Sequence, residues 1–267
     1  MLRTNRDKLP IVGLQGQVWS SKTKKTGRMT NDGEVLWVQG TGGITYNVQI
    51  GDICTGWAAD HLEPGVTTRH PDEDQNWGYT VFSCIGNEAA VSTGDAKGGK
   101  GFVTGKHGGV EHTILYFPPE VLEKLTLDDK ILVKATGQGL VLLDYPEILL
   151  RNMSPSLLDK MNIVEDSGKL RVGVAKIVPA CLMGSGIGSF TSASGDFDIT
   201  LHDPALTAEY GLETLRFGDI VAIKDSDTRY GRTYLGGAVS IGVVVHGDSN
   251  LNGHGPGVTS LMACKTP

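Results

Sequence analysis

The segment that decides the fold is residues 215–220, which read Leu-Arg-Phe-Gly-Asp-Ile. A segment with apolar residues is followed there by a Gly-Asp turn, and a strand that begins with a β-branched residue comes next. The arrangement recurs at residues 48–53 and, with Asp-Asp in place of Gly-Asp, at residues 125–131. The Gly gives a permissive backbone, and the Asp can hydrogen-bond within its own turn. Turns of this kind commonly feed strands into small β-barrels, so the three copies predict barrel-like units in both halves of the chain.

Short apolar or β-branched runs bounded by Gly or Asp extend this prediction along the chain. They lie at residues 131–133, 140–143, 172–178, 220–223 and 239–245. The last run is almost wholly apolar, so we expect both of its faces to be covered. Residues 196–202 alternate strictly, which places Asp196, Asp198 and His202 on one strand face, and we interpret that face as solvated.

Helical signals are few and short. Pro118-Pro119 opens one short helix, while Ser154-Pro155 and Asp203-Pro204 each put an N-cap residue before a proline at the first helical position. Such helices are too short to form a bundle. The expected fold class is therefore mainly β (α+β), with two β-barrel-like or sandwich lobes. Packing signals are weakest at residues 145–169, which predicts an N-terminal lobe over 1–150 and a C-terminal lobe over 165–267.

Composition narrows the class of protein. The chain has 24 Lys+Arg against 30 Asp+Glu, a net charge of −6, so clustered positive charge for nucleic acid or an anionic membrane is not expected. Neither a membrane-spanning run nor a secretory apolar stretch is evident. The four cysteines are widely spaced and form no C-x-x-C pair, which predicts reduced thiols and a cytoplasmic protein. Glycine supplies 37 of 267 residues, which favours tight turns and loops lined by backbone.

Two histidine-containing segments are candidates for chemistry. Asp60-His61 lies just before Pro64-Gly65, and an Asp-His pair can supply a metal ligand or a general base with its orienting partner, provided that the chain turns there. His107 has Gly residues on both sides, which lets its ring stand clear of the backbone. His112 fits a buried histidine bonded to a neighbour better than a ligand. Asp60, His61 and His107 are therefore the predicted catalytic residues.

The stretch 93–109 is rich in Gly and Lys, and bare backbone amides with ammonium groups can bind an anion. Lys97, Lys100 and Lys106 are candidates for that role. A flexible exposed hairpin with solvated lysines is an equally good interpretation. No Walker A sequence is present, because no Lys is followed by Ser or Thr at the required spacing.

The loop 246–259 follows the most apolar strand, the usual place for a built site. His246, Asp248 and His254 could hold a divalent metal such as zinc, with an open position for water. Ser249 and Asn252 are candidates for substrate or anion binding. The alternative is a structural turn in which Asp248 and Ser249 cap backbone amides.

Long stretches at residues 40–48, 56–61, 106–112, 215–222 and 253–258 resemble an uncharacterised bacterial domain-of-unknown-function family, the four-four-three-eight family. The resemblance covers almost the whole chain, and it implies an intact two-lobed β-rich protein without bringing an activity. Residues 217–220 and 236–242, with the His- and Gly-rich loop after them, also resemble the acetamidase/formamidase family of metal-dependent amide hydrolases. That likeness implies a metal-dependent site at the loop, although the run of acidic residues expected there is missing.

Two hypotheses follow. In the first, the chain is a metal-assisted hydrolase of a small amide or related compound: His246, Asp248 and His254 bind the ion with His61 or His107, and the segment 97–106 covers the substrate. In the second, it is a non-catalytic protein that binds a small molecule or anion, or that assembles with copies of itself. Both require the histidine-bearing bends of the two lobes to meet in one pocket. The expected partner is a small molecule, with a homo-oligomer as an open option.

Overall fold

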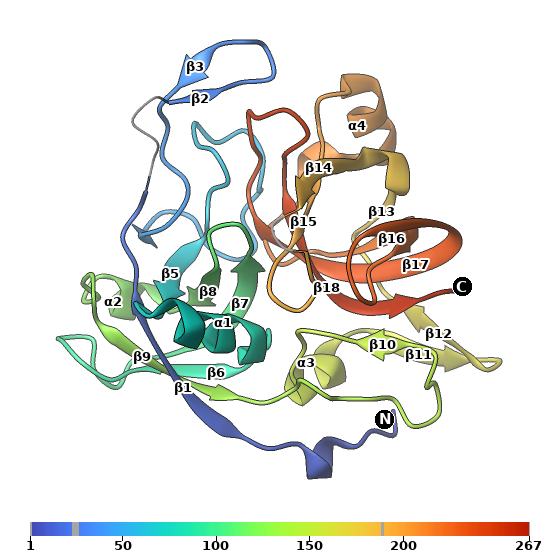
Figure 1. Cartoon of the computed structure of the whole chain (residues 1–267), viewed down its shortest axis with the longest axis horizontal. Helices are drawn as coiled ribbons and strands as arrows, with labels where there is room; N and C mark the ends of the chain where they lie inside the picture. The colour runs from blue at the N-terminus through green and yellow to red at the C-terminus, as the bar shows by residue number, and fades with distance from the viewer. Residues whose placement is uncertain (1, 23–26, 188–189, 267) are drawn as a thin grey trace.

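The computed structural model describes residues 2–22, 27–187 and 190–266. Its strands form a closed barrel in the first half of the chain and a half-barrel in the second (Figure 1). The first sheet contains β1 (Val12–Val18), β9 (Lys130–Ala135), β6 (Glu88–Val91), β7 (Lys100–His107), β8 (His112–Tyr116), β5 (Gly65–Arg69) and β4 (Ile44–Thr45) in that order. Because β1 pairs with β9 and also with β5, six of these strands close on themselves.

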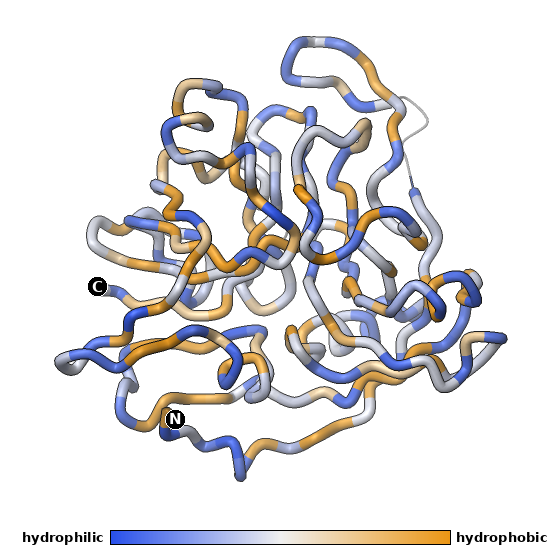
Figure 2. The backbone as a smooth tube through the Cα atoms, turned by 180° about the vertical axis from the view of Figure 1, so that it is seen from behind, coloured by the Kyte–Doolittle hydropathy of each residue, from blue (hydrophilic) through white to orange (hydrophobic). Residues whose placement is uncertain are grey.

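The half-barrel is a curved sheet of β13 (Lys176–Pro179), β16 (Ile220–Asp227), β17 (Thr233–His246), β18 (Gly257–Cys264), β15 (Phe197–Ile199) and β14 (Met183–Ile187), with β10 (Leu149–Leu150) against β18. Two separate hairpins are β2 (Arg28–Met29) with β3 (Val35–Leu36), and β11 (Ile163–Asp166) with β12 (Lys169–Val172). The mainly β fold class is confirmed. Hydrophobic and hydrophilic stretches alternate along most of the chain (Figure 2), as strands with one covered face require.

The three predicted turns form as expected. In each, the Asp side chain accepts the backbone N–H three residues earlier: Asp52 from Gln49 at 2.8 Å, Asp129 from Thr126 at 2.9 Å and Asp219 from Arg216 at 2.9 Å. Two of the turns lead into β9 and β16, whereas residue 53 makes only an isolated bridge. That bridge pairs the first copy with the third, residue 53 with residue 216. The repeated segment therefore also ties the barrel half to the half-barrel.

Three predicted helices are confirmed: α2 (Pro119–Leu122), α3 (Pro155–Lys160) and α4 (Pro204–Tyr210). Ser154 and Asp203 cap the last two through their side chains, as predicted. The sequence analysis missed α1 (Glu73–Phe82), a polar helix capped by Asp72 that buries few residues and has no apolar periodicity. Short 3-10 turns lie at Arg6–Lys8, Ala180–Leu182 and Leu212–Thr214.

Two predicted strands are wrong. Residues 140–143 alternate in burial, with Leu140 and Leu142 inside, but they only touch the N-terminal segment, through the bridge between Thr4 and Leu142. The run 172–178 is split between β12 and β13, because the N–H of Gly173 turns back to the carbonyl of Asn162 at 2.7 Å. The run 239–245 is buried over Val243, Val244 and Val245, as predicted.

The barrel and the half-barrel pack directly against each other at β7. A Cβ on Gly105 would lie 2.6 Å from Cβ of Val245 in β17, so the absence of a side chain permits this close approach. Beside it, the Thr259 hydroxyl of β18 donates to the carbonyl of Lys106 at 3.1 Å. This contact places the end of β7 next to the end of β17, and both strands end in a histidine. Among the described residues, no helix is both long and apolar enough to cross a membrane.

Candidate metal centre

Four histidines from four separate segments meet where the two sheets touch. His61 precedes β5, His107 ends β7, His246 ends β17 and His254 lies in the loop between β17 and β18. The ring centroid of His246 lies 4.2 Å from that of His107 and 5.1 Å from that of His61, and the rings of His61 and His254 are 5.0 Å apart. The structure therefore brings the predicted histidine-bearing bends together in one place.

Two carboxylates at β15 join this cluster. Asp196 is 1 % exposed and Asp198 is 3 % exposed, so the solvated face predicted for them is wrong. The strand is covered on both sides, because Phe197 is buried and Ile199 packs in the half-barrel core, while the two aspartates face the histidines. The N–H of Gly108, just after β7, donates to Oδ1 of Asp196 at 2.8 Å and leaves its Oδ2 turned toward His246.

The ligand atoms form two groups that share Asp198. In the first, Nδ1 of His254 lies 3.0 Å from Asp198 Oδ2 and 2.9 Å from Nε2 of His61, which is 3.6 Å from the same oxygen. In the second, Nε2 of His246 lies 2.7 Å from Asp196 Oδ2 and 3.6 Å from Asp198 Oδ1. Ligands about 2.1 Å from a tetrahedral ion lie about 3.4 Å apart. The ligand atoms of each group lie within 4.8 Å of one another, so each group could hold a divalent ion.

Two of the cluster histidines also have an outer contact at their other ring nitrogen. His61 has φ of 54°, a left-handed backbone that turns its ring back so that Nδ1 lies 3.1 Å from Oδ2 of Asp60. This is the turn that the sequence analysis required for the Asp60-His61 pair to serve one site. His246 holds Nδ1 at 2.9 Å from the carbonyl of Gly247, which leaves Nε2 for the cluster. A histidine that uses one nitrogen in this way presents the other to a metal.

Glu63 supports the barrel side of the cluster. Its carboxylate lies 2.5 Å from Nδ1 of His107 and 3.0 Å from Nδ1 of His112, and it accepts hydrogen bonds from the N–H of Gly42 and the hydroxyl of Thr67. His112 is thus a buried histidine bonded to a neighbour, as predicted. His107 has Nε2 as its remaining nitrogen, on a ring that borders the cavity described below.

Burial and neighbouring charges shift the pKa values of these groups in opposite directions. Burial favours a neutral carboxyl, yet His246, His254 and His61 outweigh it and hold the pKa of Asp198 well below its usual range. The pKa of Glu63 is likewise held well below its usual range, because His112 and His107 outweigh burial. The pKa of His107 is lowered by burial and by the charge of His246. Glu63 is therefore ionised and His107 neutral near pH 7, an arrangement suited to accepting a proton at Nε2.

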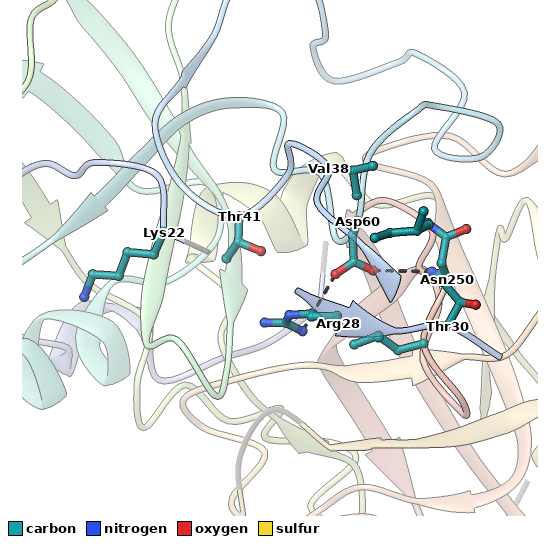
Figure 3. Close-up of a pocket in the computed structure, with 9 residues that line it drawn as sticks. Lys22, Arg28, Thr30, Val38, Thr41, Asp60 and Asn250 are labelled. Carbon is teal, nitrogen blue, oxygen red and sulfur yellow. Dashed lines mark hydrogen bonds and ion pairs between the residues drawn. The ribbon is translucent and has the colours of Figure 1, made fainter. Parts of the chain in front are cut away.

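A cavity of about 170 Å³ opens onto the cluster, lined by residues that include His61, His107, Asp198, His254 and Arg28. Arg28 also lines two adjoining cavities, one of them about 460 Å³. Its guanidinium lies 3.7 Å from Oδ2 of Asp60. Figure 3 shows one of these adjoining cavities, in which Arg28 lies on one side of Asp60 and Asn250 on the other, with Lys22 and Thr41 farther along its wall. Positive charge thus borders the site from the β2–β3 hairpin.

The structure separates the three predicted lysines from the cluster. Lys97 and Lys100 are exposed at the start of β7, whereas His107 is at its end, about 20 Å away at the rise of an extended strand. The segment 97–106 is thus a hairpin edge and a barrel strand, and it does not cover the cavity. Lys106 points away from the cavity because its ammonium is fully buried and donates to the Val81 carbonyl, the Asn152 amide oxygen and the Ala193 carbonyl, all within 2.9 Å.

The remaining predicted residues lie around the loop after β17. Asp248 belongs to neither ligand group of the described residues; its carboxylate accepts the N–H of Ser249 at 2.7 Å and lines a separate cavity with His202. Asp196 and Asp198 stand where Asp248 was expected. Ser249 donates to Oδ1 of Asp60 at 2.6 Å and so supports the partner of His61. Asn252 is exposed.

Sequence reasoning gave no role to Glu63, Arg28, Asp196 or Asp198. Asp196 and Asp198 lie two residues apart in a strand that alternates strictly, so they share a face, but nothing local shows what covers that face. Glu63 lies within the segment singled out for Asp60-His61. Its partners come from residues 42, 67, 107 and 112, which only the closed barrel brings together.

The comparisons with known proteins identify the family. The model of the N-terminal domain of unknown function DUF4438 matches residues 28–159, and that of its C-terminal domain matches residues 160–267. The chain therefore belongs to the DUF4438 family, whose function is uncharacterised. A solved structure described as "Crystal structure of TM1086" is similar at 48 % identity and a TM-score of 0.94, over 98 % of this chain and 92 % of that one. No curated protein matches the chain.

Proposed function

We propose that this protein is a metal-dependent hydrolase of a small amide-like substrate. The observation that carries the proposal is the group formed by His61, Asp198 and His254, which borders the 170 Å³ cavity. Two imidazoles and one carboxylate are a ligand set typical of catalytic zinc and related ions. A divalent ion in such a site lowers the pKa of a bound water toward 7 and polarises a carbonyl.

The surrounding residues suit amide hydrolysis. Hydrolysis joins the water oxygen to the carbonyl carbon and breaks the C–N bond, and one proton of the water must move to the leaving nitrogen. Neutral His107, oriented by Glu63 through Nδ1, is placed to accept that proton at Nε2 and pass it on. Arg28 would have the role first expected of the lysines, because its positive charge would stabilise the negative charge that develops on the carbonyl oxygen. Asp60 keeps His61 in position.

The size and surroundings of the cavity support a small substrate. Its volume is about 170 Å³, and its lining includes histidine and aspartate side chains and residues 108–110. The four cysteines are free thiols, which fits a reducing compartment such as the cytoplasm.

The test is a hydrolysis screen on the purified protein loaded with Zn²⁺, Mn²⁺ or Co²⁺. A panel of short aliphatic amides is assayed for release of ammonia, with wild type beside His254→Ala and His107→Gln. His70→Gln is the matched control, because His70 lies at the start of α1, outside the cluster. We expect turnover by wild type and the control, and loss of at least 100-fold in both cluster variants. Metal binding and ligand-induced thermal stabilisation without turnover would instead support a binding protein.

A further inference from the structure

We infer that the cluster holds a second divalent ion, bound by Asp196, Asp198 and His246, with the carboxylate of Asp198 bridging the two ions. The inference takes the first ion from the proposed function, whereas the argument for the second ion stands on its own residues. The two oxygens of Asp198 face different groups: Oδ2 lies near His254 and His61, and Oδ1 lies near His246. One carboxylate that serves two groups through different oxygens is the arrangement of paired metal sites, in which the ions are about 3.5–4 Å apart.

The second group is built for a cation. All three side chains are at most 3 % exposed, so the group is out of contact with solvent. Two carboxylates share this space with one imidazole, an acidic set of ligands whose charge a divalent cation would balance. His246 and Asp196 are both held from behind, the first by the Gly247 carbonyl and the second by the Gly108 N–H. Nε2 of His246 and Oδ2 of Asp196, which lie within hydrogen-bonding distance of each other at 2.7 Å, therefore point into the same small space from fixed directions.

Two glycines keep space at the ligand atoms, one for each group. A Cβ at Gly257, the first residue of β18, would overlap both Nε2 of His246 and Oδ2 of Asp196. A Cβ at Gly186 in β14 would overlap Oδ2 of Asp198 and press on Nδ1 of His254. The two groups can therefore be disturbed separately by the same kind of substitution.

The two ions have different surroundings. The first group borders the cavity, and its His254 side chain is 35 % exposed, so an ion there can meet a substrate. In the second group, Asp196 and Asp198 line the same cavity, whereas His246 is fully buried and does not. The second ion therefore fixes Asp198 and adds positive charge beside the first one. Its ligands, one nitrogen and two carboxylate oxygens, suit Mn²⁺, Zn²⁺ or Co²⁺.

The experiment counts bound metal without using activity. Protein stripped with a chelator is titrated with Zn²⁺ or Mn²⁺, passed through a desalting column and analysed for metal by mass spectrometry. We expect two ions per chain for wild type and for the control Asp95→Asn, which changes an exposed aspartate on the β6–β7 hairpin. We expect one ion in Asp196→Asn and in Gly257→Ala, and at most one in Asp198→Asn. Gly186→Ala is expected to lose the first ion preferentially.

A spectroscopic measurement covers the case in which a variant fails to fold. Wild type loaded with Mn²⁺ should give the electron paramagnetic resonance spectrum of an exchange-coupled pair, because bridged ions lie within about 4 Å. One ion per chain with an uncoupled spectrum overturns the second site and leaves the hydrolase proposal standing. Two coupled ions per chain without turnover of any amide would support the second metal site and overturn the hydrolase proposal. A chain that binds no metal overturns both.

Discussion

Glu63 carries more of the site than its position in a loop suggests. It is 1 % exposed, and its carboxylate contacts four polar partners, which lie in the loop before β4 and in β5, β7 and β8. A buried charge of this kind is stable only while all its partners remain. Its ring contacts fix which nitrogen His107 offers to the cavity, so one side chain links the stability of the barrel to the chemistry proposed for the cluster.

Glu63→Gln is therefore expected to destabilise the fold by about 2–4 kcal/mol, because the new amide NH₂ would face N–H and O–H donors instead of accepting from them. Urea unfolding followed by circular dichroism measures the change. Glu209→Gln, on the exposed face of α4, is the matched control and should stay within about 0.5 kcal/mol of wild type. Equal stability of the two variants would contradict the role given to Glu63.

Lys106 is a second buried charge, with a different consequence. Burial lowers the pKa of its ammonium from 10.5 to about 8, while three oxygen acceptors surround Nζ. Lys106→Met leaves those acceptors unpaired and should cost about 3 kcal/mol near pH 7. Between about pH 8 and pH 10.5 the unfolded chain holds the proton of Lys106 more tightly than the folded chain does. The contribution of Lys106 to the free energy of unfolding therefore rises with pH across that interval.

The measurement is the difference in unfolding free energy between wild type and Lys106→Met at pH 7.5 and at pH 10. Other titrating groups cancel in this difference, because both proteins carry them. We predict that the wild-type advantage grows by up to about 3 kcal/mol, the size that a shift of this extent allows. A difference that is flat or falls with pH would show that Lys106 keeps its ordinary affinity for the proton.

At the scale of elements, the contact between β7 and β17 sets the position of the whole cluster. Gly105 lies against Val245 with no room for a Cβ, and each of these strands ends one or two residues later in a cluster histidine. A change of a few tenths of an ångström at this contact moves His107 relative to His246, whose rings are 4.2 Å apart. The two sheets are thus joined at the point where the proposed chemistry depends most on the relative position of His107 and His246.

Gly105→Ala should consequently cost about 1–3 kcal/mol through overpacking and should also weaken metal binding. Gly236→Ala in β17 is the matched control, since a Cβ there meets nothing within 4 Å. Thermal unfolding and a Zn²⁺ titration of both variants test this. If Gly105→Ala bound Zn²⁺ with wild-type affinity, the contact would not be what positions the histidines.

The same elements show how far the sequence could take the prediction. The Asp-capped turns, the three short helices that begin with a proline and the β-rich class depend on local chemistry, and they were predicted correctly. The histidines His61, His107, His246 and His254 were found because they lie in polar, Gly-rich loops. The carboxylates were missed for the opposite reason: Asp196 and Asp198 look solvated on an alternating strand until the end of β7 covers them. The prediction for the lysines was wrong for another reason: Lys97 and Lys100 lie at the opposite end of β7 from His107.

At the scale of the whole molecule, the site lies between two units rather than within one. The larger hydrophobic cluster joins barrel residues such as Val103 and Ile114 to half-barrel residues such as Val245 and Leu261. The division predicted at residues 150–165 thus separates two sheets that share a core. The first ligand group is completed only by residues from both halves, because His61 comes from the barrel half and Asp198 and His254 come from the half-barrel.

Both proposals require the histidine–aspartate cluster to bind divalent metal, which anomalous X-ray diffraction can show directly. Crystals of the metal-loaded protein are measured on both sides of the zinc absorption edge. We predict strong anomalous peaks flanking the carboxylate of Asp198, one beside His61 and His254 and one beside Asp196 and His246. Crystals grown with Zn²⁺ that show no anomalous peak among these side chains would rule out metal binding by the cluster.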